Sequence, residues 1–224
     1  MTLPPGYHGS RMAPHPSRRE VWRHIANYLA DRWPELHGRV LELGAGYCDF
    51  INQLPARERF ATDLWAGLPE QVAPGVTALV QDAGVPLPPD LDAAFASNLL
   101  EHLTLDEARS CLGLVHQSLR PAGLFVCLQP NFRIAWKRYY DDFTHKTAFT
   151  DVSLADFGAS CGFEVEHVAA RFLPLTMKSS ASRLTFLVPA YLRSPIKPLA
   201  GQMLVVFRKP RVGRDEDGAN GEEP

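Results

Sequence analysis

The feature that most restricts the fold of this chain is a short apolar strand that leads directly into a glycine turn. Residues Arg39–Leu43 have the composition of a buried strand, and Gly44-Ala45-Gly46 follows at once. A helix is predicted around residues 50–54, and the next strand ends at Asp63, 19 residues after Gly44. This arrangement is typical of a nucleotide-binding βαβ unit. Glycines at the turn let the backbone approach a ligand, because they carry no Cβ.

The rest of the chain continues the alternation of helices and strands. A capping box of Ser17 and Glu20 predicts the start of the first helix, which Pro34 stops, and Thr104 with Glu107 predicts a helix that runs to Leu119. Apolar runs predict further strands at 76–80, 92–97, 124–128, 163–169 and 203–207, and a helix at 153–161. Alternating elements of this kind favour an α/β fold with a mainly parallel sheet.

Length and composition point to one globular domain. The chain has 224 residues, of which 46% are apolar and 21% charged, so it is not a disordered chain, a collagen-like fibre or a coiled coil. We predict a flexible N-terminal arm at 1–16, a single domain at 17–208 and a disordered acidic tail at 209–224. The tail accounts for the net charge of −2. The neutral body therefore predicts no binding of long nucleic acid.

The cysteines and the apolar segments indicate in which cellular compartment the protein is expected and whether it has disulfides. The four cysteines form no C-x-x-C pair, which predicts neither a disulfide framework nor a zinc ligand set. No apolar signal core is present near the N-terminus, and prolines interrupt the apolar stretch at 184–204. We therefore expect a cytoplasmic protein without a membrane span.

Two acidic residues near the glycine turn narrow the choice of ligand. Asp49 stands where a dinucleotide fingerprint has its third glycine, and its carboxylate would repel a pyrophosphate. Glu42, at the end of the first strand, can receive a positively charged amino group, or it bonds backbone amides of the glycine loop. A ligand with a ribose, a positive amine and no phosphate fits this set. That description matches S-adenosylmethionine.

The chain resembles a class I S-adenosylmethionine-dependent methyltransferase, in particular the methyltransferase type 11-like domains. The resemblance rests on Val40–Gly46, Asp63, Gln81-Asp82-Ala83, Phe95–His102 and Leu119–Leu124. It implies a Rossmann-like, seven-stranded, mainly parallel sheet with helices on both faces. The cofactor would lie across the carboxyl ends of the first, second and fourth strands.

The resemblance also implies roles for single residues. Gly44, Ala45 and Gly46 would approach the methionine moiety, with Glu42 near its amino group, and Asp63 followed by Leu64 would hold the ribose. Asp82 would bind the adenine amine beside Ala83, and Asn98 would face the methionine portion. The family often has glycine where Cys48 stands, which makes the packing of the turn less certain there.

The segment Tyr139–His145 is the most unusual part of the chain, because it gathers acids, tyrosines and a histidine in one predicted loop. His145 is a candidate general base that takes the proton of an acceptor hydroxyl, with Asp142 orienting its ring. Alternatively, Asp142 or Thr144 caps a turn and His145 fixes the loop. Asp141, Asp142 and His145 also resemble part of a divalent-ion site, but without a third well-spaced acid we assign no metal. His102 is expected to be structural.

These observations predict a methyltransferase that moves a methyl group to an oxygen or nitrogen of a small polar acceptor, with a sugar or a secondary-metabolite precursor as candidates. The alternatives are an NAD(P)-dependent oxidoreductase and a catalytically silent partner subunit that binds S-adenosylmethionine. Asp49, and the lack of a Tyr-x-x-x-Lys pair after the fifth strand, count against the oxidoreductase. The segment at 171–202 is either a substrate wall or the contact of a homodimer.

Overall fold

The structure is a computed structural model that describes residues 16–174 and 185–211. The predicted arm, apart from Pro16, and most of the predicted acidic tail lie outside these residues, as does part of the segment at 171–202. Among the helices described, none is long and apolar enough to cross a membrane.

One seven-stranded sheet organises the described part of the chain. Its strands are β1 (Arg39–Leu43), β2 (Glu58–Asp63), β3 (Val76–Val80), β4 (Leu91–Ser97), β5 (Leu119–Pro130), β6 (Glu164–Pro174) and β7 (Ala200–Arg208). Their order is β3-β2-β1-β4-β5-β7-β6, and β7 alone runs in the direction opposite to the other six strands. The prediction of a mainly parallel α/β sheet with seven strands is confirmed.

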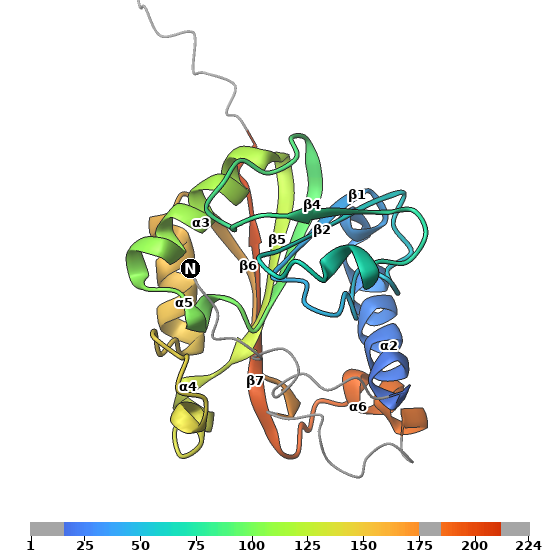
Figure 1. Cartoon of the computed structure of the whole chain (residues 1–224). Helices are drawn as coiled ribbons and strands as arrows, with labels where there is room; N and C mark the ends of the chain where they lie inside the picture. Colours follow the sequence, from blue (N-terminus) through green and yellow to red (C-terminus); the bar gives the residue numbers. More distant parts are fainter. Residues whose placement is uncertain (1–15, 175–184, 212–224) are drawn as a thin grey trace, which may run out of the picture.

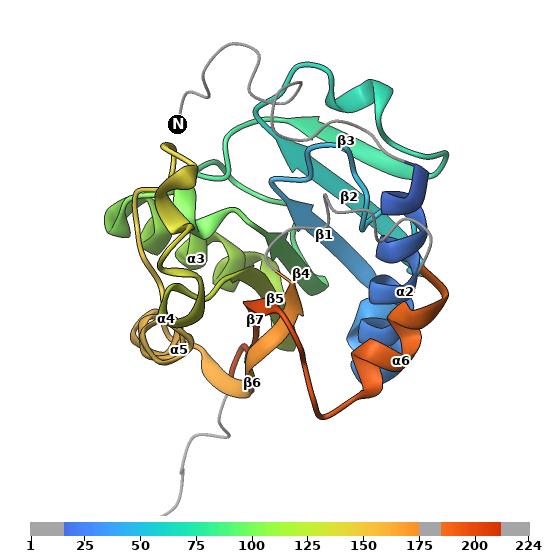
Figure 2. The same ribbon diagram turned by 90° about the horizontal axis from the view of Figure 1, so that it is seen from below.

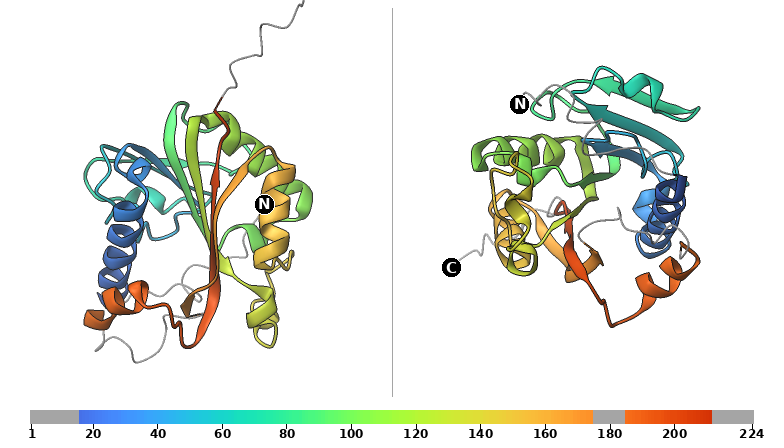
Figure 3. Two further views of the ribbon diagram at one scale, coloured as in Figure 1. Left: turned by 180° about the vertical axis from the view of Figure 1, so that it is seen from behind. Right: turned by 60° about the horizontal axis from the view of Figure 1, so that its bottom comes forward.

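Helices cover both faces of this sheet. The helices are α2 (Pro16–Arg32), α3 (Leu105–Ser118), α4 (Phe132–Ala135), α5 (Asp151–Ser160) and α6 (Val188–Arg193), with short 3-10 turns η1 (Pro34–His37), η2 (Leu68–Glu70), η3 (Leu100–His102), η4 (Tyr139–Asp141) and η6 (Thr185–Leu187). Helices α2 and α6 lie on one face, and α3 and α5 lie on the other (Figures 1 and 3). Each face buries its own apolar cluster, which is the expected way to cover a parallel sheet.

Because β1 to β4 pair in parallel, their carboxyl ends meet along one edge of the sheet. In Figure 1, β5 runs down the sheet into α4, and Figure 2 views the molecule from below, with β1, β2 and β3 seen along their length. The glycine turn after β1, Asp63 at the end of β2, and the loops after β3 and β4 therefore share one edge. Ligands of open α/β sheets bind at such an edge.

Local signals predicted several element boundaries correctly. Strand β3 has the predicted bounds, and the capping box of Thr104 and Glu107 is present, with both reciprocal hydrogen bonds, at the start of α3. The first helix begins at Pro16, so Ser17 lies in its first turn and not at the predicted cap position.

The predicted helix after the glycine turn is wrong, because residues 46–53 form successive turns. Cys48 has a φ of +56°, which a right-handed helix does not accommodate. In addition, the Ile51 N–H donates to the Glu42 carboxylate over 3.0 Å, so that amide bonds a side chain. A left-handed residue and a side-chain acceptor together replace the helix with turns.

Candidate functional site

The glycine turn has a geometry that requires glycine. Gly44 and Gly46 have φ angles of +63° and +51°, in the left-handed region that other residues seldom adopt. A Cβ on Gly44 would lie 3.0 Å from Leu99 Cδ1, which brings the loop after β4 against the turn. The Ala45 N–H donates to the Thr62 carbonyl over 3.0 Å, so the turn is also fixed to β2.

Asp63 holds the glycine turn from the end of β2. One carboxylate oxygen accepts the Gly46 N–H over 2.8 Å, and the other accepts the Trp65 N–H over 2.9 Å. The side chain is 8% exposed, and Leu64 beside it is 36% exposed. Asp63 thus fixes two neighbouring turns at the edge of the sheet. Its contact with a ribose stays a prediction.

Glu42 lies beneath the same turn and is almost completely buried. Its contact with the Ile51 N–H is the backbone-amide alternative that the sequence left open. Burial raises the pKa of this carboxyl well above its usual range, and the Ile51 N–H partly opposes that rise. An approach to the amino group of a cofactor stays a prediction for Glu42.

Asp49 forms an ion pair with Arg18 of α2. Its charge is therefore balanced, and the repulsion of a pyrophosphate that the sequence indicated is weakened. A different feature now counts against a dinucleotide, since no helix begins at the glycine turn to present its N-terminus to a phosphate.

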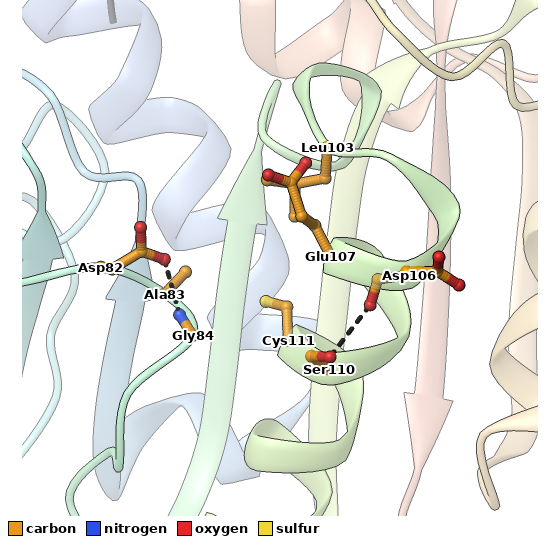
Figure 4. A pocket seen from close by; sticks show the side chains of 8 residues that line it. All are labelled: Asp82, Ala83, Gly84, Leu103, Asp106, Glu107, Ser110 and Cys111. Carbon is orange, nitrogen blue, oxygen red and sulfur yellow. Dashed lines mark hydrogen bonds between the residues drawn. The ribbon is translucent and has the colours of Figure 1, made fainter. Parts of the chain in front are cut away.

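A pocket of about 280 Å³ opens beside the end of β3 (Figure 4). It is lined by Asp82, Ala83, Gly84, Leu103, Asp106, Glu107, Ser110 and Cys111. One Asp82 oxygen accepts the Gly84 N–H over 2.8 Å, which shapes the loop that forms one wall. The first turns of α3 form the other wall.

Asn98, directly after β4, has a φ of +51°, a conformation that asparagine tolerates better than most residues. Its amide oxygen accepts from Gln202 Nε2 over 3.1 Å, and its amide nitrogen donates to Ser97 Oγ over 2.9 Å. Gln202 lies in β7, and sequence analysis did not identify it. The contact joins positions 104 residues apart, for which the sequence carries no local signal.

The loop that contains His145 is fixed against η3. The Glu101 carbonyl accepts the N–H groups of Lys146 and Thr147 over 2.8 and 3.1 Å. Thr147 Oγ1 donates to the Leu103 carbonyl over 2.6 Å, and the Tyr139 hydroxyl donates to the Thr147 carbonyl over 2.5 Å. These bonds bring His145 beside His102, with ring centroids 4.9 Å apart.

Asp142 forms a turn, as one of the alternatives predicted. Its Oδ1 accepts both the N–H and the hydroxyl of Thr144, over 3.1 and 2.6 Å, and the same hydroxyl lies 2.9 Å from His102 Nδ1. Because the hydroxyl proton goes to Asp142, the hydroxyl accepts from a protonated His102 Nδ1. Burial, together with the nearby His145, lowers the pKa of His102 to about 4, so the ring is neutral near pH 7. The predicted roles of Asp142 and His145 in catalysis stay predictions.

Glu101 is the residue that sequence analysis missed. It is fully buried, and among the described residues neither carboxylate oxygen has a hydrogen bond of normal geometry. Burial raises the pKa of this carboxyl to about 8. Potential ligand atoms of Glu101, His102 and His145 all lie within 4.8 Å of one another. Asp141, by contrast, is exposed and pairs with Arg138 over 3.3 Å.

Comparison with known proteins identifies the fold. No family model matches the chain, and no curated protein matches it by sequence. Among solved structures, an S-adenosylmethionine-dependent methyltransferase from Mesorhizobium loti is similar with a TM-score of 0.61 at 20% identity, covering 83% of this chain and 98% of that one. An S-adenosylmethionine-dependent methyltransferase from Archaeoglobus fulgidus is similar with a TM-score of 0.58 at 18% identity, covering 84% of this chain and 94% of that one.

A third similar structure was solved with a ligand. It is the N-methyltransferase NodS from Bradyrhizobium japonicum in complex with S-adenosyl-L-homocysteine, with a TM-score of 0.61 at 14% identity, covering 90% of this chain and 91% of that one. Together with the strand order, these similarities show that the chain has the Rossmann-like fold of class I methyltransferases.

Proposed function

We propose that the protein is an S-adenosylmethionine-dependent methyltransferase that binds its cofactor across the carboxyl ends of β1, β2 and β4. The observation that carries this proposal is the left-handed glycine turn, held by the Asp63 carboxylate at the edge where the four strand ends meet. A backbone without side chains, next to a carboxylate, suits a nucleoside that brings a ribose and no phosphate. The similar solved methyltransferases support this reading.

Within this proposal, each candidate residue faces one part of the cofactor. The turn Gly44-Ala45-Gly46 receives the methionine moiety with Glu42 below it, and Asp63 and Leu64 receive the ribose. Asp82 and Ala83 receive the adenine at the pocket after β3, which has acidic side chains that can accept from an exocyclic amine. Asn98 lies near the methionine portion, and Gln202 supports its amide.

The acceptor in this proposal is a small polar molecule that offers an oxygen or a nitrogen. The loop with His145 lies against η3, which begins two residues after Asn98. In this proposal the loop therefore places polar and aromatic groups beside the methyl group to be transferred. A sugar or a secondary-metabolite precursor fits such a lining. The methyl of a sulfonium is already a strong electrophile, so the main task of the site is alignment in a water-excluded space.

Titration calorimetry with the full chain tests the cofactor proposal. We expect micromolar binding of S-adenosylmethionine and S-adenosylhomocysteine, and no binding of NADH. Preference for NADH would support the oxidoreductase alternative and overturn the proposal. Release of S-adenosylhomocysteine on addition of hydroxyl and amine acceptors then distinguishes an enzyme from a silent partner subunit, because a silent subunit binds the cofactor without turning it over.

The glycine turn gives a second test of the same site. Gly44→Ala is expected to lower the affinity for S-adenosylmethionine at least tenfold and the free energy of unfolding by about 1–2 kcal/mol, because alanine is strained at positive φ. Gly113→Ala in α3 is the matched control. Apart from the adjacent residues and the backbone of α3 itself, no described atom lies within 4 Å of a Cβ at this position, so we expect a stabilisation of about 0.5–1 kcal/mol and unchanged affinity. Equal cofactor affinities of the two variants would contradict this placement of the cofactor.

A further inference from the structure

The cluster at the acceptor side contains an arrangement that methyl transfer from a sulfonium does not itself require. Glu101 and His102 come from η3, and His145 comes from the loop more than 40 residues later. Two imidazoles and one carboxylate, converging from two segments, form a common ligand set for divalent transition metals. This set differs from Asp141, Asp142 and His145, the residues that resemble part of a divalent-ion site in the sequence.

The buried carboxylate gives the strongest indication of a ligand. Glu101 is 0% exposed, and its oxygens lack hydrogen bonds of normal geometry to any residue that the structure describes. A buried polar group without a partner costs free energy. A cation held between Glu101, His102 and His145 would supply the missing interaction and remove that cost.

The surroundings of the cluster resemble the outer shell of a metal site. Asp142, Thr144 and His102 Nδ1 form a chain of hydrogen bonds, with steps of 2.6 and 2.9 Å. Because the Nδ1–H of His102 donates to this chain, the other ring nitrogen, Nε2, carries a lone pair that can bind a metal. The backbone bonds of Lys146 and Thr147 to the Glu101 carbonyl fix the loop that carries His145. The ligand set is thus largely preorganised.

We propose that Glu101, His102 and His145 bind one divalent transition-metal ion, with Zn²⁺ as the type case. Ligand atoms around a tetrahedral ion at zinc distances are about 3.3 Å apart. The ligand atoms now lie within 4.8 Å of one another, so binding of the ion would draw them closer together by up to about 1.5 Å. Three protein ligands leave at least one coordination position for another ligand, as in catalytic sites.

The role of the ion, though not its binding, rests on the proposed methyl transfer. An acceptor hydroxyl at the open position would be more acidic, because the ion would stabilise the resulting alkoxide, and its proton would leave to bulk water before the cofactor and acceptor exclude water from the site. The oxygen then forms a bond to the methyl carbon while the carbon–sulfur bond breaks and its electron pair returns to sulfur. The products are an ether and neutral S-adenosylhomocysteine. In this assignment the lone pair of His145 is used by the ion, so His145 is a ligand and not a general base.

Titration of the chelator-treated full chain with Co²⁺, followed by visible absorption, tests the site. We expect saturation at one ion per chain, displacement by Zn²⁺ and no displacement by Mg²⁺ at equal concentration. His145→Gln and Glu101→Gln should each weaken Co²⁺ binding at least about tenfold, and Thr144→Val, which removes the support of His102, by about tenfold. His116→Gln changes a histidine on α3 outside the cluster and should leave Co²⁺ binding unchanged.

Equal Co²⁺ affinities of the wild type and His145→Gln would overturn the metal proposal, as would a similar loss in His116→Gln. His145 is only half-buried, so its variant keeps the test valid if Glu101→Gln does not fold. Titrating the same samples with S-adenosylmethionine separates the two proposals. If the chain bound Co²⁺ but not S-adenosylmethionine, the metal proposal would stand and the methyltransferase proposal would fail. If it bound S-adenosylmethionine but not Co²⁺, the methyltransferase proposal would stand and the metal proposal would fail.

Discussion

Asp63→Asn is expected to lower the affinity for S-adenosylmethionine by about 100-fold. Each hydrogen bond to a charged group contributes about 1.5–3 kcal/mol, and a ribose offers two hydroxyls to this carboxylate. The substitution also places an amide nitrogen against the N–H of either Gly46 or Trp65, both of which now donate to the carboxylate. Titration calorimetry measures the cofactor affinity, and circular dichroism shows whether the turn region stays folded.

The matched control for this substitution is Asp31→Asn. Asp31 belongs to α2, and its side chain is 70% exposed. Its Oδ2 lies 4.0 Å from Nη2 of Arg193. The same change of acid to amide there should leave the cofactor affinity unaltered. If Asp63→Asn bound S-adenosylmethionine as tightly as Asp31→Asn does, the ribose would have to lie elsewhere, and the proposed orientation of the cofactor would be wrong.

Phe95→Ala is expected to lower the free energy of unfolding by about 3–5 kcal/mol. Phe95 is fully buried in β4, its ring is stacked on Phe50 with centroids 3.7 Å apart, and Trp22 of α2 meets it edge-on at 6.3 Å. Removal of the ring leaves a cavity beneath the turns that follow the glycine motif. Urea denaturation, analysed by linear extrapolation, measures the change.

Phe186→Ala provides the comparison, because Phe186 is 68% exposed in η6 and should change the free energy of unfolding by less than about 0.5 kcal/mol. A loss below about 1 kcal/mol for Phe95→Ala would mean that neighbouring side chains fill the space, and that α2 and the glycine segment do not depend on this stack.

The parts of the fold that could be predicted from sequence are those governed by local signals. The bounds of β3 and the cap of α3 follow from an apolar run and from the pair Thr104 and Glu107, whose effects span only a few residues. The helix after Gly46 was predicted incorrectly for the opposite reason. The left-handed Cys48 and the bond from Ile51 to Glu42 depend on how the turn packs against β1, which a periodic pattern does not reveal.

The same distinction explains what was missed at the acceptor side. His102 and His145 are conspicuous in the sequence as single residues, because one histidine follows a strand and the other lies in a polar loop. Glu101, within Phe95–His102, carries no such local signal. Its importance comes from its complete burial and from backbone bonds to a segment 45 residues away, and neither is visible in the local sequence. Gln202 was missed for the same reason.

The position of β7 has a consequence for the order in which the sheet can form. The strand that is synthesised last of the seven lies between β5 and β6, both of which precede it in the chain. Until residues 200–208 have left the ribosome, β6 has no strand to pair with, and β5 exposes an open edge. The nascent chain can thus fold β1 to β5 early, but the edge of β5 stays unpaired until β7 has been synthesised. Completion of the sheet is therefore a late, long-range event, and the interval before it is when the chain is most exposed to aggregation.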